Sequence, residues 1–111
     1  MNQLERIPEI IATYRKHGWR LRRVLLRPET RAALADDDVM IFEDAPLEES
    51  EVDALWFARA SHAGREAWEL RLIAETPYAL FETFEADEAE EDREEVRREM
   101  EARLKDYAAR S

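Results

Sequence analysis

The sequence predicts an α+β domain: an N-terminal helix, a mainly antiparallel sheet of four to five strands with a short helix after the first strand, and a long charged C-terminal helix. Three observations support this class. Apolar residues recur at spacings of three and four near the start, alternate with polar residues in the middle, and are sparse among charges near the end. With 111 residues, of which 45% are hydrophobic, the chain is expected to form a single domain over residues 1–111 with its own core.

The N-terminal segment predicts a helix over residues 5–17. Its apolar residues have helical spacing: Leu4, Ile7, Ile11 and Tyr14. Pro8 fits within the first turn, where a missing N–H costs little. Gly18 follows a basic turn and therefore marks the end of the helix.

The next part of the chain alternates between short elements. We expect a strand over residues 19–27 and a short helix over 28–35 that begins at Pro28. The wholly apolar run Val39–Phe42 is a further strand candidate, and residues 44–51 are expected to be a solvated connection.

Two tight turns then predict a three-stranded meander, at His62-Ala63 and at Thr76-Pro77. In the resulting registers Phe57 lies opposite Trp68, and Leu72 lies opposite Phe81. Six apolar residues would then share one face that packs against helices: Leu55, Phe57, Trp68, Leu70, Leu72 and Phe81.

The last element is a predicted helix over residues 87–109. Acidic residues crowd its first turns and basic residues follow, which matches the helix dipole. Pairs such as Glu99 and Arg103, four residues apart, favour the helix. Its apolar stripe is thin, so the sequence leaves open whether the segment 85–111 packs on the domain or is partly detached.

The second face of the meander mixes apolar and charged residues, and such a face is seldom left bare. A terminal helix or the Val39–Phe42 segment could cover it. Alternatively, it forms a homodimer seam or a groove for a peptide. The candidate interaction residues, with the two aromatic ones as anchors and the two charged ones setting orientation, are Trp56, Arg71, Leu80, Glu82 and Phe84.

Charge is segregated along the chain. Residues 1–35 carry eight basic and three acidic residues, whereas the whole chain has 17 basic and 27 acidic ones and a net charge of −10. Strand alternation predicts that Arg22 and Arg23 fall on opposite faces, which argues against a basic platform. We therefore expect these arginines to pair with the acidic residues of the chain, and we expect no nucleic-acid partner. An alternative is a pocket for a small anionic ligand, in which Arg23 would hold the anion and Trp19 would stack on the ligand.

The sequence contains no recognisable catalytic or metal-binding constellation. Without cysteine there is no thiolate nucleophile and no cysteine-ligated metal, and two histidines cannot build a three-histidine site. Ser61-His62 is interpreted as a hairpin turn, and Asp36-Asp37-Asp38 as a solvated loop. We expect no cofactor, no metal and no catalytic residues.

The first 30 residues contain no long apolar run, so we expect neither a signal peptide nor a membrane span. We therefore expect a cytoplasmic location. The bias toward arginine and alanine favours a bacterial source. The leading functional hypothesis is a non-catalytic protein–protein interaction module, with a homodimer as one form. The alternative is an anion-binding pocket between the sheet and the first helix.

Overall fold

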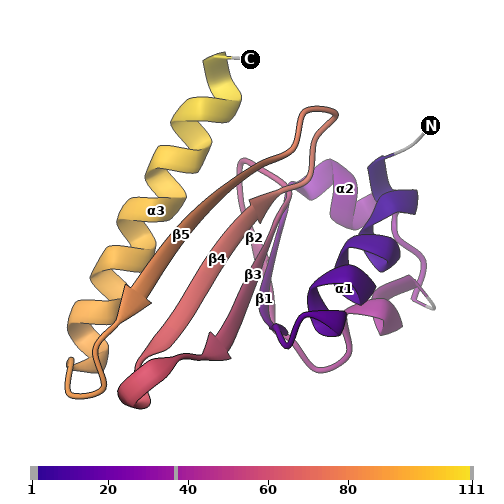
Figure 1. Cartoon of the computed structure of the whole chain (residues 1–111). Coiled ribbons are helices and arrows are strands. Elements are labelled where there is room, and N and C mark those ends of the chain that lie inside the picture. The colour runs from indigo at the N-terminus through magenta and orange to yellow at the C-terminus, as the bar shows by residue number, and fades with distance from the viewer. Residues whose placement is uncertain (1–2, 37, 111) are drawn as a thin grey trace.

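A five-stranded sheet lies between helices on both of its faces, which confirms the α+β class (Figure 1). The computed structural model describes residues 3–36 and 38–110. The strand order is β2-β1-β3-β4-β5, and only the β1–β2 pair is parallel. The strands are β1 Arg20–Leu26, β2 Leu47–Glu49, β3 Ala54–Ala60, β4 Glu66–Leu72 and β5 Tyr78–Phe84.

The N-terminal helix forms as the apolar spacing predicts. A 3-10 turn, η1 Gln3–Arg6, leads into α1 Ile7–Lys16, and Pro8 lies in the first turn of α1. Ile7 and Ile11 are buried against the sheet. The chain then reverses at Gly18, whose φ of 87° is in the left-handed region that favours glycine.

The short helix after the first strand is also present, as α2 Pro28–Ala33. Asp53, a buried residue directly before β3, holds the first turn of α2 in place. Its carboxylate accepts hydrogen bonds from the backbone N–H of Arg27 at 2.8 Å and from the Thr30 hydroxyl at 2.7 Å. The carboxylate therefore caps α2 from a distant part of the chain.

Two local predictions between residues 38 and 51 are wrong. Val39–Phe42 lies in a 3-10 helix, η2 Asp38–Phe42, that buries Phe42 under the sheet instead of forming a strand. Conversely, the expected solvated connection contains the parallel strand β2, in which Leu47 lies opposite Val24. Only three residues of β2 pair with β1, and such a short edge strand carries no alternation to recognise. Asp37, the middle residue of the predicted acidic loop, lies outside the described residues.

The predicted register of the first hairpin is wrong by one residue. Phe57 lies opposite Glu69, and Trp68 lies opposite Ala58. The loop between β3 and β4 is the 3-10 turn η3 His62–Gly64, in which Ala63 and Gly64 have positive φ, so it holds one residue more than a two-residue turn. A shift of one residue moves every side chain of β4 to the other face.

The second hairpin differs from its prediction by three residues. Leu72 lies opposite Tyr78 and not Phe81, because the connection runs from Ile73 to Pro77. This odd shift again exchanges the faces, so Phe81 returns to the face of Leu55 and Phe57. Leu70 and Leu72 lie on the opposite face.

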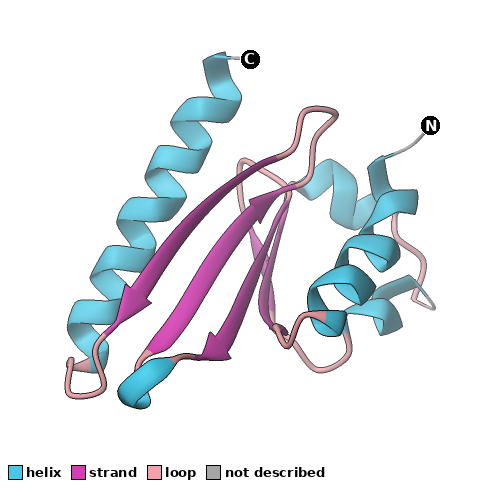
Figure 2. Ribbon diagram, viewed as in Figure 1, coloured by secondary structure: helices cyan, strands magenta, loops and turns pink. Residues whose placement is uncertain are grey.

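Both faces of the sheet are therefore apolar, and each packs against helices (Figure 2). One face, with Leu55 and Phe57, is covered by α1 and η2. The other, with Trp56 and Leu70, is covered by the C-terminal helix α3 Glu90–Arg110 through Met100 and Leu104. Continuous burial from Ala54 to Ala58 is what a strand covered on both sides shows.

Candidate interaction surface

The five predicted interaction residues do not form one surface. α3 covers Trp56, Leu80 and Phe84, which are 0%, 8% and 1% exposed. Glu82 is exposed on β5, and Arg71 lies on the α1 side of the sheet beside Tyr14. Of the two coverings that the sequence left open, a terminal helix is the one that the structure places over the two aromatic residues.

The contacts of α3 with the sheet include an arginine that is almost fully buried. Arg97 is 1% exposed, and its guanidinium carbon lies 4.3 Å from the ring centre of Trp68 and 5.6 Å from that of Phe84. Its charge is paired with Glu90 and lies near Glu94, whose Oε1 is 3.6 Å from the Arg97 Nε. Two aromatic faces and two carboxylates thus stabilise a cation in a place where burial alone would be costly.

Arg23, the predicted anion contact, is occupied by a carboxylate of α3. Its two terminal nitrogens donate to the two oxygens of Glu94 at 2.9 and 2.6 Å. This two-point hydrogen bond lowers the pKa of Glu94 to about 2 and raises that of Arg23.

Other arginines of the basic N-terminal third are paired in the same way. The Arg15 Nη2 atom lies 2.5 Å from Glu43 Oε1, and the Arg27 Nε atom lies 3.2 Å from Asp53 Oδ2. The expectation that the chain's own acidic residues occupy these arginines is confirmed for Arg15, Arg23 and Arg27.

A β-bulge changes where the arginines of β1 point. The register slips between Leu21 and Arg23, so Arg22 is the extra residue. The Arg22 guanidinium carbon lies 5.1 Å from the ring centre of Trp68, on the same side of the sheet as the Arg23–Glu94 pair. The prediction that Arg22 and Arg23 fall on opposite faces is therefore wrong.

Trp19, the other predicted anion contact, packs on the α1 side of the sheet. Its ring meets Tyr14 and Phe81 edge to face, with centres 6.1 and 6.3 Å apart, and the Arg59 guanidinium carbon lies 4.7 Å from it. Trp19 and Arg23 nevertheless both line a cleft of about 730 Å³ at the start of β1, together with Arg15, Arg20, Arg22 and Glu43.

Tyr14 fills the space between α1 and the sheet. Its ring stacks on Phe57 with centres 4.0 Å apart, and its hydroxyl donates to Glu69 of β4. Burial and this hydrogen bond to a carboxylate raise the pKa of Tyr14 to about 12, so the hydroxyl stays a donor at neutral pH.

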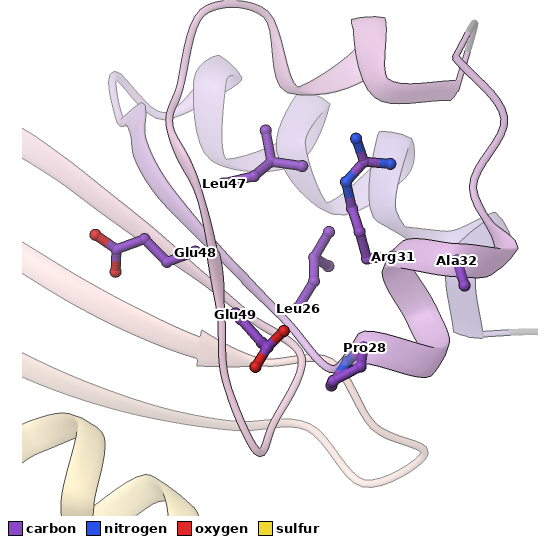
Figure 3. Close-up of a pocket in the computed structure, with 7 residues that line it drawn as sticks. All are labelled: Leu26, Pro28, Arg31, Ala32, Leu47, Glu48 and Glu49. Carbon is purple, nitrogen blue, oxygen red and sulfur yellow. The ribbon is translucent and has the colours of Figure 1, made fainter.

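A second cleft, of about 300 Å³, lies between α2 and β2 (Figure 3). It is lined by Leu26, Pro28, Arg31, Ala32, Leu47, Glu48 and Glu49. The side chains of Arg31 and Glu48 point in different directions in Figure 3, so the cleft lacks the converging polar groups of a specific ligand site.

An exposed aromatic residue of the sheet lies in β5. Phe81 is 58% exposed on the α1 side, and its neighbour Ala79 is exposed as well, because α1 covers β1 and β3 and leaves β5 bare. β5 also ends the strand order, so among the described residues it pairs with β4 alone. Exposed aromatic surface and an unpaired strand edge therefore coincide in β5.

The register shows which backbone groups of β5 face outward. Ile73 donates its N–H to the Asp53 carbonyl at 2.9 Å, so the odd residues of β4 bond toward β3 and the even ones toward β5. Their partners in β5 are also even-numbered, which leaves Ala79, Phe81 and Thr83 with their N–H and C=O groups at the open edge. Consistently, the N–H of Thr83 donates to the Glu82 carboxylate, at 3.2 Å.

Sequence reasoning did not identify this edge. The predicted registers place Phe81 on a packed face with five other apolar residues. Which strand ends the sheet depends on long-range pairing, and the sequence pattern of β5 carries no sign of it.

Comparisons with family models, with curated proteins and with solved structures found no match for this chain. Within residues 3–36 and 38–110, no group of three or more histidine and acidic side chains is placed to hold a metal ion. In the same residues, no helix has the length and apolar character needed to cross a bilayer.

Proposed function

We propose that this chain is a non-catalytic protein–protein interaction module whose binding surface is the open edge of β5 together with the exposed ring of Phe81. One observation carries the proposal: an outward-facing row of backbone groups lies next to a phenylalanine that is 58% exposed. Adding a strand at such an edge supplies backbone hydrogen bonds, and an exposed apolar side chain supplies a hydrophobic anchor.

The surroundings of Phe81 fit such a role. Trp19 supports the ring from one side, and Arg59 and Glu69 provide polar groups on the same face of the sheet. An apolar centre with a polar rim is the usual composition of an interface.

The non-catalytic part of the proposal rests on the residues available for chemistry. Ser61 and His62, adjacent in the sequence, are both exposed at the β3–β4 loop, where water has free access. A cytoplasmic location is part of the same proposal and fits a chain without cysteine.

Photo-crosslinking from within the interface tests the proposal. A benzoylphenylalanine at position 81 is expected to form covalent adducts in the native host of the protein. The matched control carries the same group at Met40, which is 75% exposed but lies in η2 and not in β5. No adduct from position 81, or the same adducts from both positions, would show that β5 is not the binding surface.

A second candidate function is the binding of a small anion in the cleft of about 730 Å³ at the start of β1. It is favoured by Arg20 and Arg22, which line this cleft and make no ion pair with the described residues. Titration with inorganic pyrophosphate at constant ionic strength is expected to raise the melting temperature saturably in the wild type and not in Arg20→Glu. Equal shifts in both proteins would contradict a specific site.

A further inference from the structure

We infer that the partner of the β5 edge is a second copy of this chain, related by a two-fold axis that passes next to Phe81. This inference rests on the proposed function, because it names the occupant of the same edge. It adds a feature that the edge alone does not supply: a self-complementary row of charges on α3.

The position of this row follows from the contacts of α3. Glu94 and Glu101 bind Arg23 of β1 and Trp56 of β3, so their flank of the helix faces the centre of the sheet. Tyr107 stacks on Tyr78 of β5 with ring centres 3.6 Å apart, so its flank faces the outer edge. With about 100° of rotation per residue, the residues within about 80° of Tyr107 on its outer side are Asp92, Val96, Glu99, Arg103 and Arg110, and Asp106 lies just beyond them.

The charges on this outer flank are divided by position. Asp92 and Glu99 lie toward the N-terminal end of α3, and Arg103 and Arg110 lie toward its C-terminal end. All four are exposed. Glu99 and Arg103 make no ion pair with any described residue, although they are four residues apart, and Arg110 pairs only with its neighbour Asp106.

α3 and β5 run in opposite directions, which fixes how the charges meet across the axis (Figure 1). Tyr107 lies at the level of Tyr78. The guanidinium carbons of Arg93 and Arg97 lie 5.9 and 5.6 Å from the ring centre of Phe84, so Phe84 lies at the level of about residue 95 of α3. Phe81, midway between these two positions in β5, therefore lies at the level of about residue 101 of α3, given rises of about 3.3 Å per strand residue and 1.5 Å per helix residue.

A two-fold axis at Phe81 pairs positions that lie equally far on either side of residue 101. Glu99 then meets Arg103 of the partner subunit, and Asp92 meets Arg110 of the partner subunit. α3 packs over β4 and β5, so the two helices would be on the order of 10–14 Å apart, a gap that a glutamate and an arginine side chain bridge together. All four cross-pairs are attractive.

The strand edge is self-complementary about the same axis. Phe81 would exchange both backbone hydrogen bonds with its own copy, and Ala79 would do so with Thr83 of the partner subunit, giving about six bonds in total. The Thr83 N–H would leave the Glu82 carboxylate for a carbonyl. The two Phe81 rings would lie side by side on the α1 face, where each is now 58% exposed.

Sedimentation velocity on the purified chain tests this arrangement. The wild type, of 13.1 kDa, is expected to sediment as a dimer at about 100 μM and to dissociate on dilution. Glu99→Arg and Arg103→Glu each replace two attractive cross-pairs with two repulsive ones, and each is expected to raise the dissociation constant about tenfold or more. Phe81→Glu is expected to be monomeric.

Mixing the two charge variants gives the sharpest result. The Glu99→Arg chain carries arginine at both positions 99 and 103, and the Arg103→Glu chain carries glutamate at both. An equimolar mixture is therefore expected to form a heterodimer in which both cross-pairs are attractive. The matched controls Glu91→Arg and Arg98→Glu make the same changes at exposed positions on the opposite flank and should leave the dimer unchanged. Circular dichroism of each variant verifies that the fold is retained.

The outcomes separate this inference from the proposed function. A monomeric wild type at 100 μM, charge variants that dimerise normally, or a mixture that fails to restore the dimer would overturn the homodimer. Crosslinks from position 81 to a different protein would also overturn it while supporting the interaction module. The absence of any crosslink from position 81 would remove both.

Discussion

At the scale of single residues, the Arg23–Glu94 pair is the contact through which the basic strand and the acidic helix stabilise each other. The carboxylate has a pKa of about 2 against an ordinary value of 4.5, because Arg23 donates two hydrogen bonds to its charged form. A depressed pKa in the folded state stabilises the fold above the ordinary pKa. This stabilisation is lost as the pH falls toward the folded value.

We therefore predict that the wild type is more stable than Glu94→Gln by about 2 kcal/mol at pH 6, and that the difference disappears between about pH 4.5 and pH 2. Urea unfolding at a series of pH values measures it. Glu95→Gln removes the neighbouring, exposed carboxylate and should show no such difference. A Glu94→Gln difference that does not change with pH would contradict the role of the Arg23 hydrogen bonds.

The sequence predicted the ion pairs of the basic residues but not the burial of Arg97, and the two differ in cause. That arginines would pair with internal acids followed from the surplus of acid alone. The burial of Arg97 between Trp68 and Phe84 did not, because a charged residue in a strongly charged helix is expected to face water. Its environment is made by two strands that are distant in the sequence.

At the scale of elements, α2 depends on a carboxylate that lies outside it. The helix has only six residues, and its N-cap residue Arg27 supplies no side-chain cap. Asp53 satisfies the Arg27 N–H and the Thr30 hydroxyl, and it is only 7% exposed. A helix this short is not stable by itself and needs such tertiary support.

Asp53→Ala is accordingly expected to lower the free energy of unfolding by about 2–3 kcal/mol, since it leaves buried donors without an acceptor. Chemical denaturation followed by circular dichroism measures the loss. Asp44→Ala removes an exposed aspartate of the loop between η2 and β2 and should change stability by less than about 0.5 kcal/mol. Equal effects would mean that the Asp53 contacts do not stabilise α2.

The helices and longer strands were predictable because each has its own periodicity, whereas the faces of the meander strands depend on the loops between them. Adding one residue to the β3–β4 loop, at Ala63 and Gly64, reversed the face assignment of β4. The three-residue difference in the next hairpin reversed it again for β5. Periodicity locates a strand, but the number of residues in its turn decides which way its side chains point.

At the scale of the whole molecule, the two termini cover opposite faces of one sheet, and β5 lies at the edge that neither covers fully (Figure 1). The basic and acidic segments of the chain also occupy distinct places in the fold. Basic β1 pairs with the acidic first half of α3 through Arg23 and Glu94, while Arg103 and Arg110 in the second half of α3 are exposed.

If two copies associate through β5, folding and association are coupled. We predict that the melting temperature of the wild type rises by a few degrees for each tenfold increase in protein concentration, because only the folded chain presents the paired edge. Differential scanning calorimetry from about 5 to 500 μM measures this dependence. Phe81→Glu should melt at one temperature across the range, and a concentration-independent wild type would argue against the dimer.

The sequence by itself determined the class of fold, the positions of the two terminal helices and the pairing of Arg15, Arg23 and Arg27 with acidic residues of the chain. These follow from local periodicity and from a surplus of carboxylates, both of which are readable one segment at a time. Only the tertiary structure decided which side chains share a face, that α3 covers Trp56 and Phe84, and that Phe81 stands at an open edge. These depend on strand order and on loop lengths counted to the residue, and no local pattern in the chain encodes either of them.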